Sequence, residues 1–505
     1  KGGSMMAITA AQLARWRAGD WRDFVKTCCI MRRPDGTIGP LQLSDRQARW
    51  MDAIAARKRD GSPRYSTISL VQPKRSGKTT VAGAASLYVA STDEDRLNIH
   101  LSNSRESAED LSFRQVREFL RHGPLGGAAD VQRGRILFPA LGSEIRAVPC
   151  STLTTAGLTC SGLLVSDELW AAVDTEPFDL LMKQRTLQAQ ALVVSQASGL
   201  ESRVYELHEL AQKGTAAHLW HDYITPEELD ECGSPNPYMT PAKLAEWRAE
   251  TPVKAQWDHW FRNLWAEGAG EYLDPEDLQA AIISAALPTT RRELEALLGA
   301  EVSECSFASG LDRAMPGTTT GDESWFVTAA RTPADRVLVV QAEHCETGAK
   351  TEVKAAWDFA ARLIGWWPWL QLEVYQSKDL ADEWGPEWCE AVTPSGPRQH
   401  AIFSALARLF VERRIGIPEG AEVLVKQLGT FGCDTSTQPP RYGKKVNRKA
   451  DDSVYGLAWA VDGLQVPVPT MDPEQVAEIE REAERELARE YATFIHTEGL
   501  GAARL

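Results

Sequence analysis

The sequence has little that would tie it to a membrane or to an oxidising compartment. No apolar run approaches the roughly 18 residues that a membrane-spanning helix needs, and we expect no secretory leader. Its nine cysteines form no Cys-x-x-Cys pair and have no histidine partner at metal-ligand spacing. These absences predict reduced thiols, no zinc site and no membrane partner, and they favour a cytosolic chain.

Positive charge is also scarce. The chain carries 55 Lys and Arg against 70 Asp and Glu, a net charge of −15, which excludes a surface covered throughout with nucleic-acid-binding charge. If DNA is bound, a local basic lining must bind it against an acidic exterior. A chain of 505 residues is too long for one ordinary core, so we expect a soluble globular protein of two domains.

What the sequence does contain is a phosphate-binding turn, Val71–Thr80, which reads VQPKRSGKTT. It follows Tyr65–Leu70, an apolar and β-branched stretch that predicts a buried strand, and it precedes Val81–Ala90, which predicts a helix. Strand, turn, Gly-Lys-Thr and helix is the context of a phosphate loop, although Gln72 stands where the first glycine is expected. An exposed turn without a ligand is the alternative, because Gly-Lys-Thr is common by chance.

The residue types of this turn suit a nucleoside triphosphate. The N-terminus of the helix offers unpaired N–H groups and the positive end of its dipole to an anion. Lys78 would reach the β- and γ-phosphates, and the Thr79 hydroxyl would ligate Mg²⁺. The candidate contacts to ATP in this turn are Gln72, Lys74, Arg75, Ser76, Gly77, Lys78, Thr79 and Thr80.

A pair of carboxylates supports the phosphate-loop interpretation. The apolar stretch Gly162–Ser166 predicts a strand, and it ends in Asp167 and Glu168. Asp167 suits a ligand of the Mg²⁺ shell, and Glu168 suits the base that orients the attacking water. Strands often end in solvated carboxylates, so this pair alone is weak, but after a phosphate loop it predicts an ATPase.

Three further segments of this half have two interpretations each. Gln47 could present its amide to an adenine edge, or it could be a solvated helix residue. The stretch Ser195–Ser198, at the end of a predicted strand, could sense the γ-phosphate or could be a plain turn. The tryptophans of Trp247–Trp265 favour packing over stacking on nucleic acid.

The periodicity of apolar residues changes in the second half of the chain. Its predicted elements follow the order β-β-β-α-β-α, which is typical of a ribonuclease-H-like fold. They are the strands Cys305–Leu311, Trp325–Ala329 and Arg336–Ala342, the helix Val353–Ile364, the strand Leu370–Tyr375 and later helices that include Val454–Val461.

In that fold the first strand and a late helix bring carboxylates together at one end of the sheet. Asp312, Asp451 and Asp452 occupy those places and could hold two divalent metals for phosphodiester hydrolysis. Each of them could instead be a turn or N-cap residue. The fold class expected for the whole chain is α/β, with an N-terminal P-loop ATPase domain of the RecA/ASCE-like kind followed by a ribonuclease-H-like nuclease domain.

The expected domain limits follow from these patterns. They are an N-terminal helical segment at 1–40, a P-loop ATPase domain at 41–286, a linker at 287–300, a nuclease domain at 301–466 and a charged helical tail at 467–505.

Together these residues resemble the large terminase subunit of tailed bacteriophages and prophages, the motor that packages viral genomes. The resemblance covers roughly Leu41 to Gly463, and it depends on the order of several motifs. The matching features are Gln47 as the adenine contact, Gln72–Thr80 as a variant phosphate loop, Asp167 and Glu168 as the acidic pair, Ser195–Ser198 as the coupling segment, Asn236–Trp265 as an Asn-Pro followed by a Trp-rich helix, and Asp312, Asp451 and Asp452 as the nuclease aspartates.

The resemblance implies a subunit that hydrolyses ATP to move double-stranded DNA into a procapsid and that cuts concatemeric DNA. It implies ATP and Mg²⁺ in the ATPase site, and Mg²⁺ or Mn²⁺ in a two-metal nuclease site. The implied partners are DNA, the portal protein, the small terminase subunit and further copies of the chain in a ring on the portal. The implied location is the host cytoplasm, at the procapsid during assembly.

The sequence departs from the family pattern at two places. Gln376 stands where the second nuclease acid is expected, so Asp379 or Glu373 substitutes for it or that acid is absent. Ala156 replaces a basic residue that the family often has before Gly157, which leaves the arginine finger open. The candidates for that arginine are Arg146 and Arg135.

Two other functions compete with a packaging motor. A DNA-repair or restriction-type ATPase-nuclease without a capsid would need a second RecA-like lobe, and the sequence shows one set of ATPase motifs. A binding or structural protein with an inactive phosphate loop is disfavoured, because the Lys and Thr of the loop and both carboxylates of the pair are present.

Overall fold

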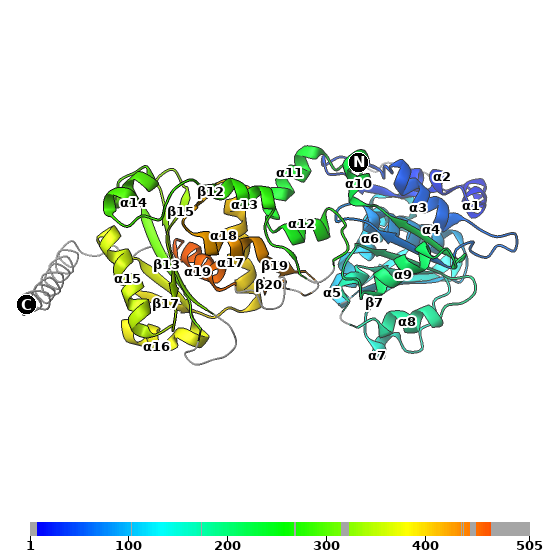
Figure 1. Ribbon diagram of the computed structural model, residues 1–505. Coiled ribbons are helices and arrows are strands. Elements are labelled where there is room, and N and C mark those ends of the chain that lie inside the picture. The colour runs from blue at the N-terminus through cyan, green and yellow to red at the C-terminus, as the bar shows by residue number, and fades with distance from the viewer. Residues whose placement is uncertain are drawn as a thin grey trace, which may run out of the picture. The chain divides into compact units, whose positions relative to one another are not determined.

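The computed structural model describes residues 8–102, 104–172, 174–266, 269–314, 323–435, 437, 439–444 and 451–465. The chain forms two compact units (Figure 1), the first made of Lys1–Arg248 with Gln256–Gly268 and the second of Ala249–Ala255 with the residues from Ala269 onward. The predicted tail, 467–505, lies outside the described residues. Within the described ranges, no helix is both long and apolar enough to span a bilayer. All nine cysteines are free thiols, as predicted.

The first unit is built on an eight-stranded sheet. In spatial order its strands are β10 (Leu219–Tyr223), β3 (Thr67–Val71), β9 (Gln190–Ser195), β8 (Leu163–Asp167), β4 (Leu97–Ser102), β7 (Ser143–Pro149), β6 (Arg135–Phe138) and β5 (Asp130–Gln132). Neighbours from β10 to β7 are parallel, whereas β6 and β5 add antiparallel strands. Because β3, β9 and β8 run parallel, the phosphate loop and the acid pair leave the same edge of the sheet, and β9 lies between them as in the RecA/ASCE-like folds.

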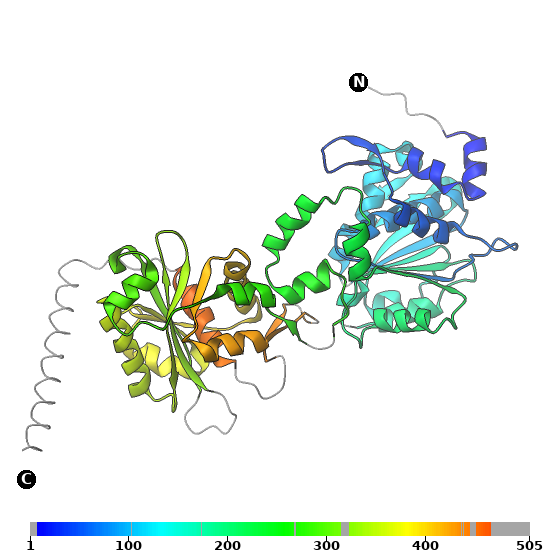
Figure 2. The same ribbon diagram turned by 45° about the horizontal axis from the view of Figure 1, so that its top comes forward.

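Helices cover both faces of this sheet (Figure 2). The helices along this part of the chain are α1 (Ala10–Arg17), α2 (Trp21–Cys28), α3 (Asp45–Ala55), α4 (Lys78–Thr92), α5 (Arg105–Asp110), α6 (Ser112–His122), α7 (Thr152–Thr155), α8 (Glu176–Lys183), α9 (Arg203–Gln212), α10 (Pro226–Cys232), α11 (Pro241–Glu250) and α12 (Lys254–Trp260). Along β8, Leu163 and Val165 join the core under α4, whereas Leu164 joins the opposite core with Phe178 of α8. This alternation follows from the two-residue period of a strand buried on both faces.

Two expectations for the first unit need correction. The amphipathic pattern of Glu106–Leu120 predicts one helix, whereas the structure has two, because Leu111 adopts φ −90° and ψ −118° and ends α5 before α6 begins. The described part of the predicted N-terminal segment, residues 8–40, is also not separate from this unit. Trp16 and Phe24 are fully buried in the same core as β3 and α4, and a two-stranded sheet of β1 (Ile30–Arg32) and β2 (Ile38–Pro40) follows them.

The second unit has a seven-stranded sheet. Its order is β12 (Ile282–Ile283), β18 (Ile415–Pro418), β15 (Val337–Cys345), β14 (Ser324–Arg331), β13 (Ser306–Asp312), β16 (Trp369–Glu373) and β17 (Cys389–Val392). The chain runs antiparallel from β13 to β14 and from β14 to β15, and then β16 and β17 run parallel to β13. This is the ribonuclease-H-like arrangement that the order of elements predicted.

Helices again lie on both faces of the sheet. Figure 1 shows α15 (Lys350–Ile364) and α16 (Val374–Trp384) on one side, and α17 (Gly396–Val411), α18 (Glu422–Thr430) and α19 (Asp452–Gly463) on the other. The remaining elements are α13 (Pro275–Ala281), α14 (Arg291–Leu298) and a small sheet of β11 (Gly270–Glu271), β19 (Phe431–Asp434) and β20 (Arg441–Lys444).

The chain enters the second unit earlier than the predicted linker at 287–300. β11 and β12 already pair with β19 and β18. Leu294 and Leu298 of α14 are buried in the core of the second unit. The charged surface of this helix suggested a free connection, but its apolar stripe packs against the sheet.

Two glycines set how closely α19 crosses β13. A Cβ atom on Gly310 would lie 2.1 Å from the carbonyl oxygen of Gly456 and 2.4 Å from the nitrogen of Ala460. On the helix side, a Cβ on Gly456 would lie 3.2 Å from the carbonyl oxygen of Trp325. The backbones therefore touch, which brings the start of α19 to the end of β13 that carries Asp312.

We expect Gly310→Ala to destabilise the second unit by about 1–3 kcal/mol or more, because the new methyl group meets rigid backbone atoms. Urea unfolding followed by circular dichroism measures the change. The matched control is Gly429→Ala in α18, whose Cβ would meet only a side-chain carbon of Leu278 at 3.7 Å. Equal stability of the two variants would show that the crossing of α19 and β13 is not tight.

Candidate nucleotide and metal sites

The phosphate loop joins β3 to α4 through two left-handed residues. Arg75 has φ 65° and Gly77 has φ 85°, and α4 begins at Lys78 with Gly77 as its N-cap. A Cβ on Gly77 would lie 2.4 Å from the amide nitrogen of Gln47. Glycine is therefore required there both by its backbone angle and by the side chain above it.

The loop and the acid pair meet, as predicted. Thr79 Oγ1 lies 3.3 Å from Asp167 Oδ1, and Lys78 Nζ lies 3.7 Å from Glu168 Oε1. Lys78 Nζ also donates to the carbonyl oxygen of Pro73 at 3.3 Å. A lysine, a hydroxyl and two carboxylates thus converge where β3 and β8 end.

Asp167 and Glu168 have different environments. Asp167 is 2% exposed, and its Oδ2 atom has no hydrogen-bond partner in the described part of the chain. Burial, followed by the charge of Glu168, raises the pKa of Asp167 above its ordinary value. A buried carboxylate with one unused oxygen fits a cation. Glu168 has φ 58°, a strained conformation for a non-glycine residue that often marks functional sites.

Other buried polar atoms around the loop also lack partners among the described residues. They are Ser76 Oγ, Gln72 Oε1 and both amide atoms of Gln196, and all three side chains are fully buried. An unsatisfied buried polar group typically costs about 1–3 kcal/mol. Their concentration beside one loop indicates a site arranged for a polar ligand.

The predicted contacts Lys74 and Arg75 lie against tryptophans. Lys74 Nζ is 3.4 Å from the ring centre of Trp260, and the guanidinium of Arg75 is 5.2 Å from that of Trp247. Burial lowers the pKa of Lys74 to about 8. The carbonyl oxygen of Arg75 accepts a bond from Asn236 Nδ2 at 2.8 Å. The Trp-rich segment therefore packs against the loop, as the favoured interpretation predicted.

The two glutamines predicted at this site use part of their amides within the protein. Gln47 is 3% exposed; its Nε2 donates to the Ser76 carbonyl at 2.8 Å, and its Oε1 accepts from the Ser44 nitrogen at 3.1 Å. Gln72 donates from Nε2 to the carbonyl oxygen of Asp222 at 2.8 Å. Gln47 therefore holds the loop at Ser76, and Gln72 holds the loop to β10. Thr80 is half-buried on the first turn of α4.

Asn263 is a residue of this site that sequence reasoning missed. It is fully buried with φ 57°, and its amide nitrogen donates to the carbonyls of Val71 at 3.0 Å and Ile224 at 2.9 Å. Its Oδ1 accepts from the nitrogen of Ala197 at 2.9 Å. Asn263 thus ties together the ends of β3, β9 and the loop after β10. An asparagine inside an aromatic run was the available signal.

The second candidate site gathers carboxylates around a phenol. Tyr455, one turn into α19, is half-buried, and its pKa is raised by burial and then by nearby carboxylate charges. In order of effect these charges come from Asp451, Asp312, Glu373 and Asp452. The predicted aspartates therefore lie in one neighbourhood, together with a glutamate.

The acid beside Asp312 is Glu373, and the predicted strand Leu370–Tyr375 needs correction. β16 ends at Glu373, and α16 starts at the next residue. Leu311 pairs with Leu372, so Asp312 and Glu373 are the next residues along two parallel strands. Burial raises the pKa of Glu373 above its ordinary value.

Gln376 and Asp379 lie on α16 and bind Arg313. Arg313 Nη1 donates to the carbonyl oxygen of Gln376 at 3.1 Å and to Asp379 Oδ1 at 2.7 Å. The side chain of Arg313 is 8% exposed, whereas that of Asp379 is 62% exposed. Asp379 therefore neutralises a buried arginine from the surface.

No group of three or more His, Cys, Asp or Glu side chains within the described ranges is arranged to hold a metal ion. The donor chemistry of the second site is nevertheless all oxygen, which suits Mg²⁺ and Mn²⁺. Asp452 Oδ2 accepts from the nitrogen of Glu323 at 3.2 Å.

Both arginine-finger candidates bind the same carboxylate. Arg135 and Arg146 each contact Glu144 with two nitrogens, at 2.7–3.0 Å. Their side chains are 45% and 30% exposed. Either arginine would have to leave Glu144 to act on a phosphate.

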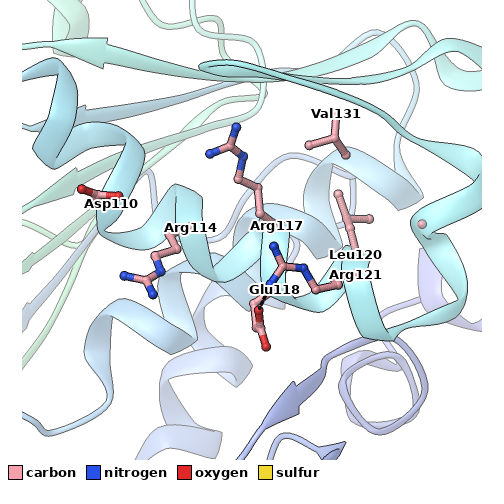
Figure 3. A pocket seen from close by; sticks show the side chains of 8 residues that line it. Asp110, Arg114, Arg117, Glu118, Leu120, Arg121 and Val131 are labelled. Carbon is pink, nitrogen blue, oxygen red and sulfur yellow. Dashed lines mark ion pairs between the residues drawn. The ribbon is translucent and has the colours of Figure 1, made fainter.

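A cavity of about 650 Å³, lined by three arginines and by the carboxylates of Asp110 and Glu118, lies along α6 (Figure 3). Arg114, Arg117 and Arg121 line it from one helix face, because they follow i, i+3 and i+7 spacing. Arg121 lies 3.6 Å from Glu118, and its side chain is 73% exposed. Arg114 is exposed and has no ion-pair partner in the part of the chain that the structure describes.

Comparison with known proteins gives matches among solved structures alone, since no family model and no curated protein match the chain. The large terminase of a thermophilic bacteriophage is 12% identical with a TM-score of 0.48, and the match covers 83% of this chain and 98% of that one. The HK97 bacteriophage large terminase is 15% identical with a TM-score of 0.41, covering 89% and 99%. The large terminase nuclease of the thermophilic phage G20c with bound magnesium is 14% identical with a TM-score of 0.29, covering 37% and 94%. The solved structures to which the chain is similar are thus large terminases of bacteriophages.

Proposed function

We propose that the first unit hydrolyses ATP. The observation that carries this proposal is the convergence of Lys78 and Thr79 with Asp167 and Glu168, at 3.3–3.7 Å, from two strands far apart in the sequence. Phosphate release by the purified chain, with and without duplex DNA, tests it. A folded chain that binds ATP without turning it over would contradict the proposal.

Each group has a defined role in this proposal. Lys78 neutralises charge on the β- and γ-phosphates, and the N-terminus of α4 donates N–H groups to them. Thr79 and the unused oxygen of Asp167 would hold Mg²⁺, which supplies charge neutralisation between those phosphates. Glu168 orients the attacking water and accepts its proton. Gln47 would read the adenine edge only by exchanging its present bonds.

We propose that the second unit cuts DNA with divalent metal ions. Asp312, Glu373, Asp451 and Asp452 would hold Mg²⁺ or Mn²⁺, and the ions would activate water and stabilise charge on the phosphodiester. Of the two candidates for the second acid, Asp379 and Glu373, this proposal uses Glu373, because it ends the strand next to Asp312.

The two activities together fit a genome-packaging motor. ATP hydrolysis would move double-stranded DNA into a procapsid, and the nuclease would cut the concatemer. A portal protein, a small terminase subunit and further copies of the chain would be its partners, in the host cytoplasm. The arginines of the α6 cavity give such a motor a local basic surface on an acidic chain.

We expect Arg114→Gln, Arg117→Gln and Arg121→Gln to weaken DNA binding additively and without sequence preference. Each phosphate contact that is lost should lower the slope of log K against log salt by about one unit. Fluorescence anisotropy with a labelled duplex at several salt concentrations measures both quantities.

The control is Arg59→Gln, an exposed arginine of the same unit outside the cavity. It removes one charge, so any general effect of net charge appears in it as well. If the triple variant and this control gave the same affinity and slope, the α6 face would not contact DNA.

A further inference from the structure

Trp170 holds the carboxylate of Glu168, and nothing in the proposed chemistry accounts for this. Trp170 Nε1 donates to Glu168 Oε2, while the other oxygen, Oε1, lies 3.7 Å from Lys78 Nζ. The backbone nitrogen of Trp170 in turn bonds to Ser195 Oγ at 3.2 Å, at the end of β9. One carboxylate oxygen is therefore fixed, and the other faces the phosphate loop.

The indole has its own support. His259 is 2% exposed and meets the Trp170 ring edge to face, with ring centres 4.7 Å apart and planes at 87°. Neither ring nitrogen of His259 has a hydrogen-bond partner among the described residues. Burial, followed by the charges of Lys74 and Lys78, lowers the pKa of His259 to about 3, so the imidazole is neutral. It contributes packing beside Trp170 and adds no competing positive charge.

We infer that Trp170 is a positioning residue for ATP hydrolysis: its indole N–H, supported by His259, holds Glu168 so that Oε1 faces the attacking water. The inference rests on the proposed function. A base oriented by a third group is a recurrent arrangement in activated sites. Glu168 is the single left-handed residue between the end of β8 and the 3-10 helix Leu169–Ala171, and it belongs to neither element, so the Trp170 contact is what restricts the direction of its side chain.

Trp170→Phe tests the inference, because it keeps an aromatic ring and removes the N–H. We expect kcat for ATP to fall about tenfold or more, with KM and ADP affinity within about twofold. Loss of packing should be small, since Trp170 already borders an open cavity of about 640 Å³. An unchanged kcat would overturn the inference, and a parallel loss of ADP affinity would reduce Trp170 to a structural role.

A double-variant comparison shows whether Trp170 acts through Glu168. Glu168→Asp keeps a carboxylate but shortens the side chain, so the indole contact is already lost. In the Glu168→Asp background, Trp170→Phe should lower kcat by less than about twofold, because the effects of substitutions at interacting residues do not add. The same tenfold loss in both backgrounds would contradict the inference. His259→Phe should keep the activity that His259→Ala loses; equal losses would exclude support by packing.

A measurement without turnover separates this inference from the proposed function. In protein labelled with ¹⁵N-tryptophan, the indole N–H signal that disappears in Trp170→Phe should lie downfield and move upfield in Glu168→Ala. Such a shift would support the contact even if the chain did not hydrolyse ATP. A signal that did not respond to Glu168→Ala would refute the contact even in an active ATPase.

Discussion

Glu168→Gln is expected to lower ATP turnover by about 100-fold or more while ATP binding remains. The variant keeps the size of the side chain and the acceptor for Trp170, but it removes the negative charge that accepts a proton from water. Loss of one preorganised group in an active site typically costs about 10²–10³ in kcat. Phosphate release gives the rate, and isothermal titration with ADP gives the affinity.

Lys78→Ala should lose both turnover and affinity, since it removes a positive charge from the phosphates in the ground state as well. The matched control is Glu231→Gln, an exposed carboxylate on α10 of the same unit. It should leave rate and affinity unchanged. Near-normal turnover in Glu168→Gln, in a protein that unfolds at the wild-type temperature, would remove Glu168 from the role of base.

The phosphate loop and acid pair could be predicted from the sequence because their signals are local. Gly77 and Lys78 lie where a turn after a strand leads into a helix, and Asp167 and Glu168 lie at the end of an apolar strand. The parallel sheet then brings these ends together without further information. The structure confirms the contact, while the chemical roles of the residues remain predictions.

Side-chain directions within the loop could not be predicted. Lys74 and Arg75 were assigned to the nucleotide on the basis of their charge. Their positions depend on Trp260 and Trp247, which are distant in the sequence and reach the loop only through the tertiary fold. Asn263 could not be predicted for the same reason. Its amide bonds to three separate segments of the chain, and no local sequence pattern marks it.

The ends of strands also could not be predicted accurately from the sequence. The apolar pattern predicted the existence of β16, but it placed the end of the strand two residues too late, at Tyr375, and so put Gln376 directly after the strand. The pairing of Leu311 with Leu372 fixes the end at Glu373. Helix breaks such as that at Leu111 are equally invisible, because the apolar period continues across them.

The nuclease prediction depends on that strand end. Asp312→Ala and Glu373→Ala should each lower metal-dependent DNA cleavage by more than about 100-fold while ATP turnover stays within about twofold. Removing a side chain that binds the metal directly should lower activity at least as much as the roughly 10–100-fold loss that is typical when an outer-shell partner is removed. Cleavage of a supercoiled plasmid, with Mg²⁺ and Mn²⁺ titrated separately, measures the effect.

Substitutions of Gln376 and Asp379 on α16 test whether Glu373 or another residue is the second acid of the site. Gln376→Asp should leave metal dependence unchanged, because Gln376 lies beyond the strand and its backbone, not its amide, meets Arg313. Asp379→Ala should lower the rate of DNA cleavage by no more than about tenfold, since Arg313 keeps its bond to the carbonyl oxygen of Gly348 at 2.8 Å. Glu373→Asp should need more metal than the wild type and still cut.

Each contrary outcome identifies a different error. If Asp379→Ala abolished cleavage and Glu373→Ala did not, Asp379 would be the displaced acid and its pairing with Arg313 would open when metal binds. If Gln376→Asp lowered the metal requirement, the site would lack a carboxylate that Glu373 does not supply. If Asp312→Ala also stopped ATP turnover in a folded protein, the two activities would not be separable between units. None of these outcomes is expected, because Glu373 follows Leu372, the residue that pairs with Leu311, and therefore lies next to Asp312 on the neighbouring strand.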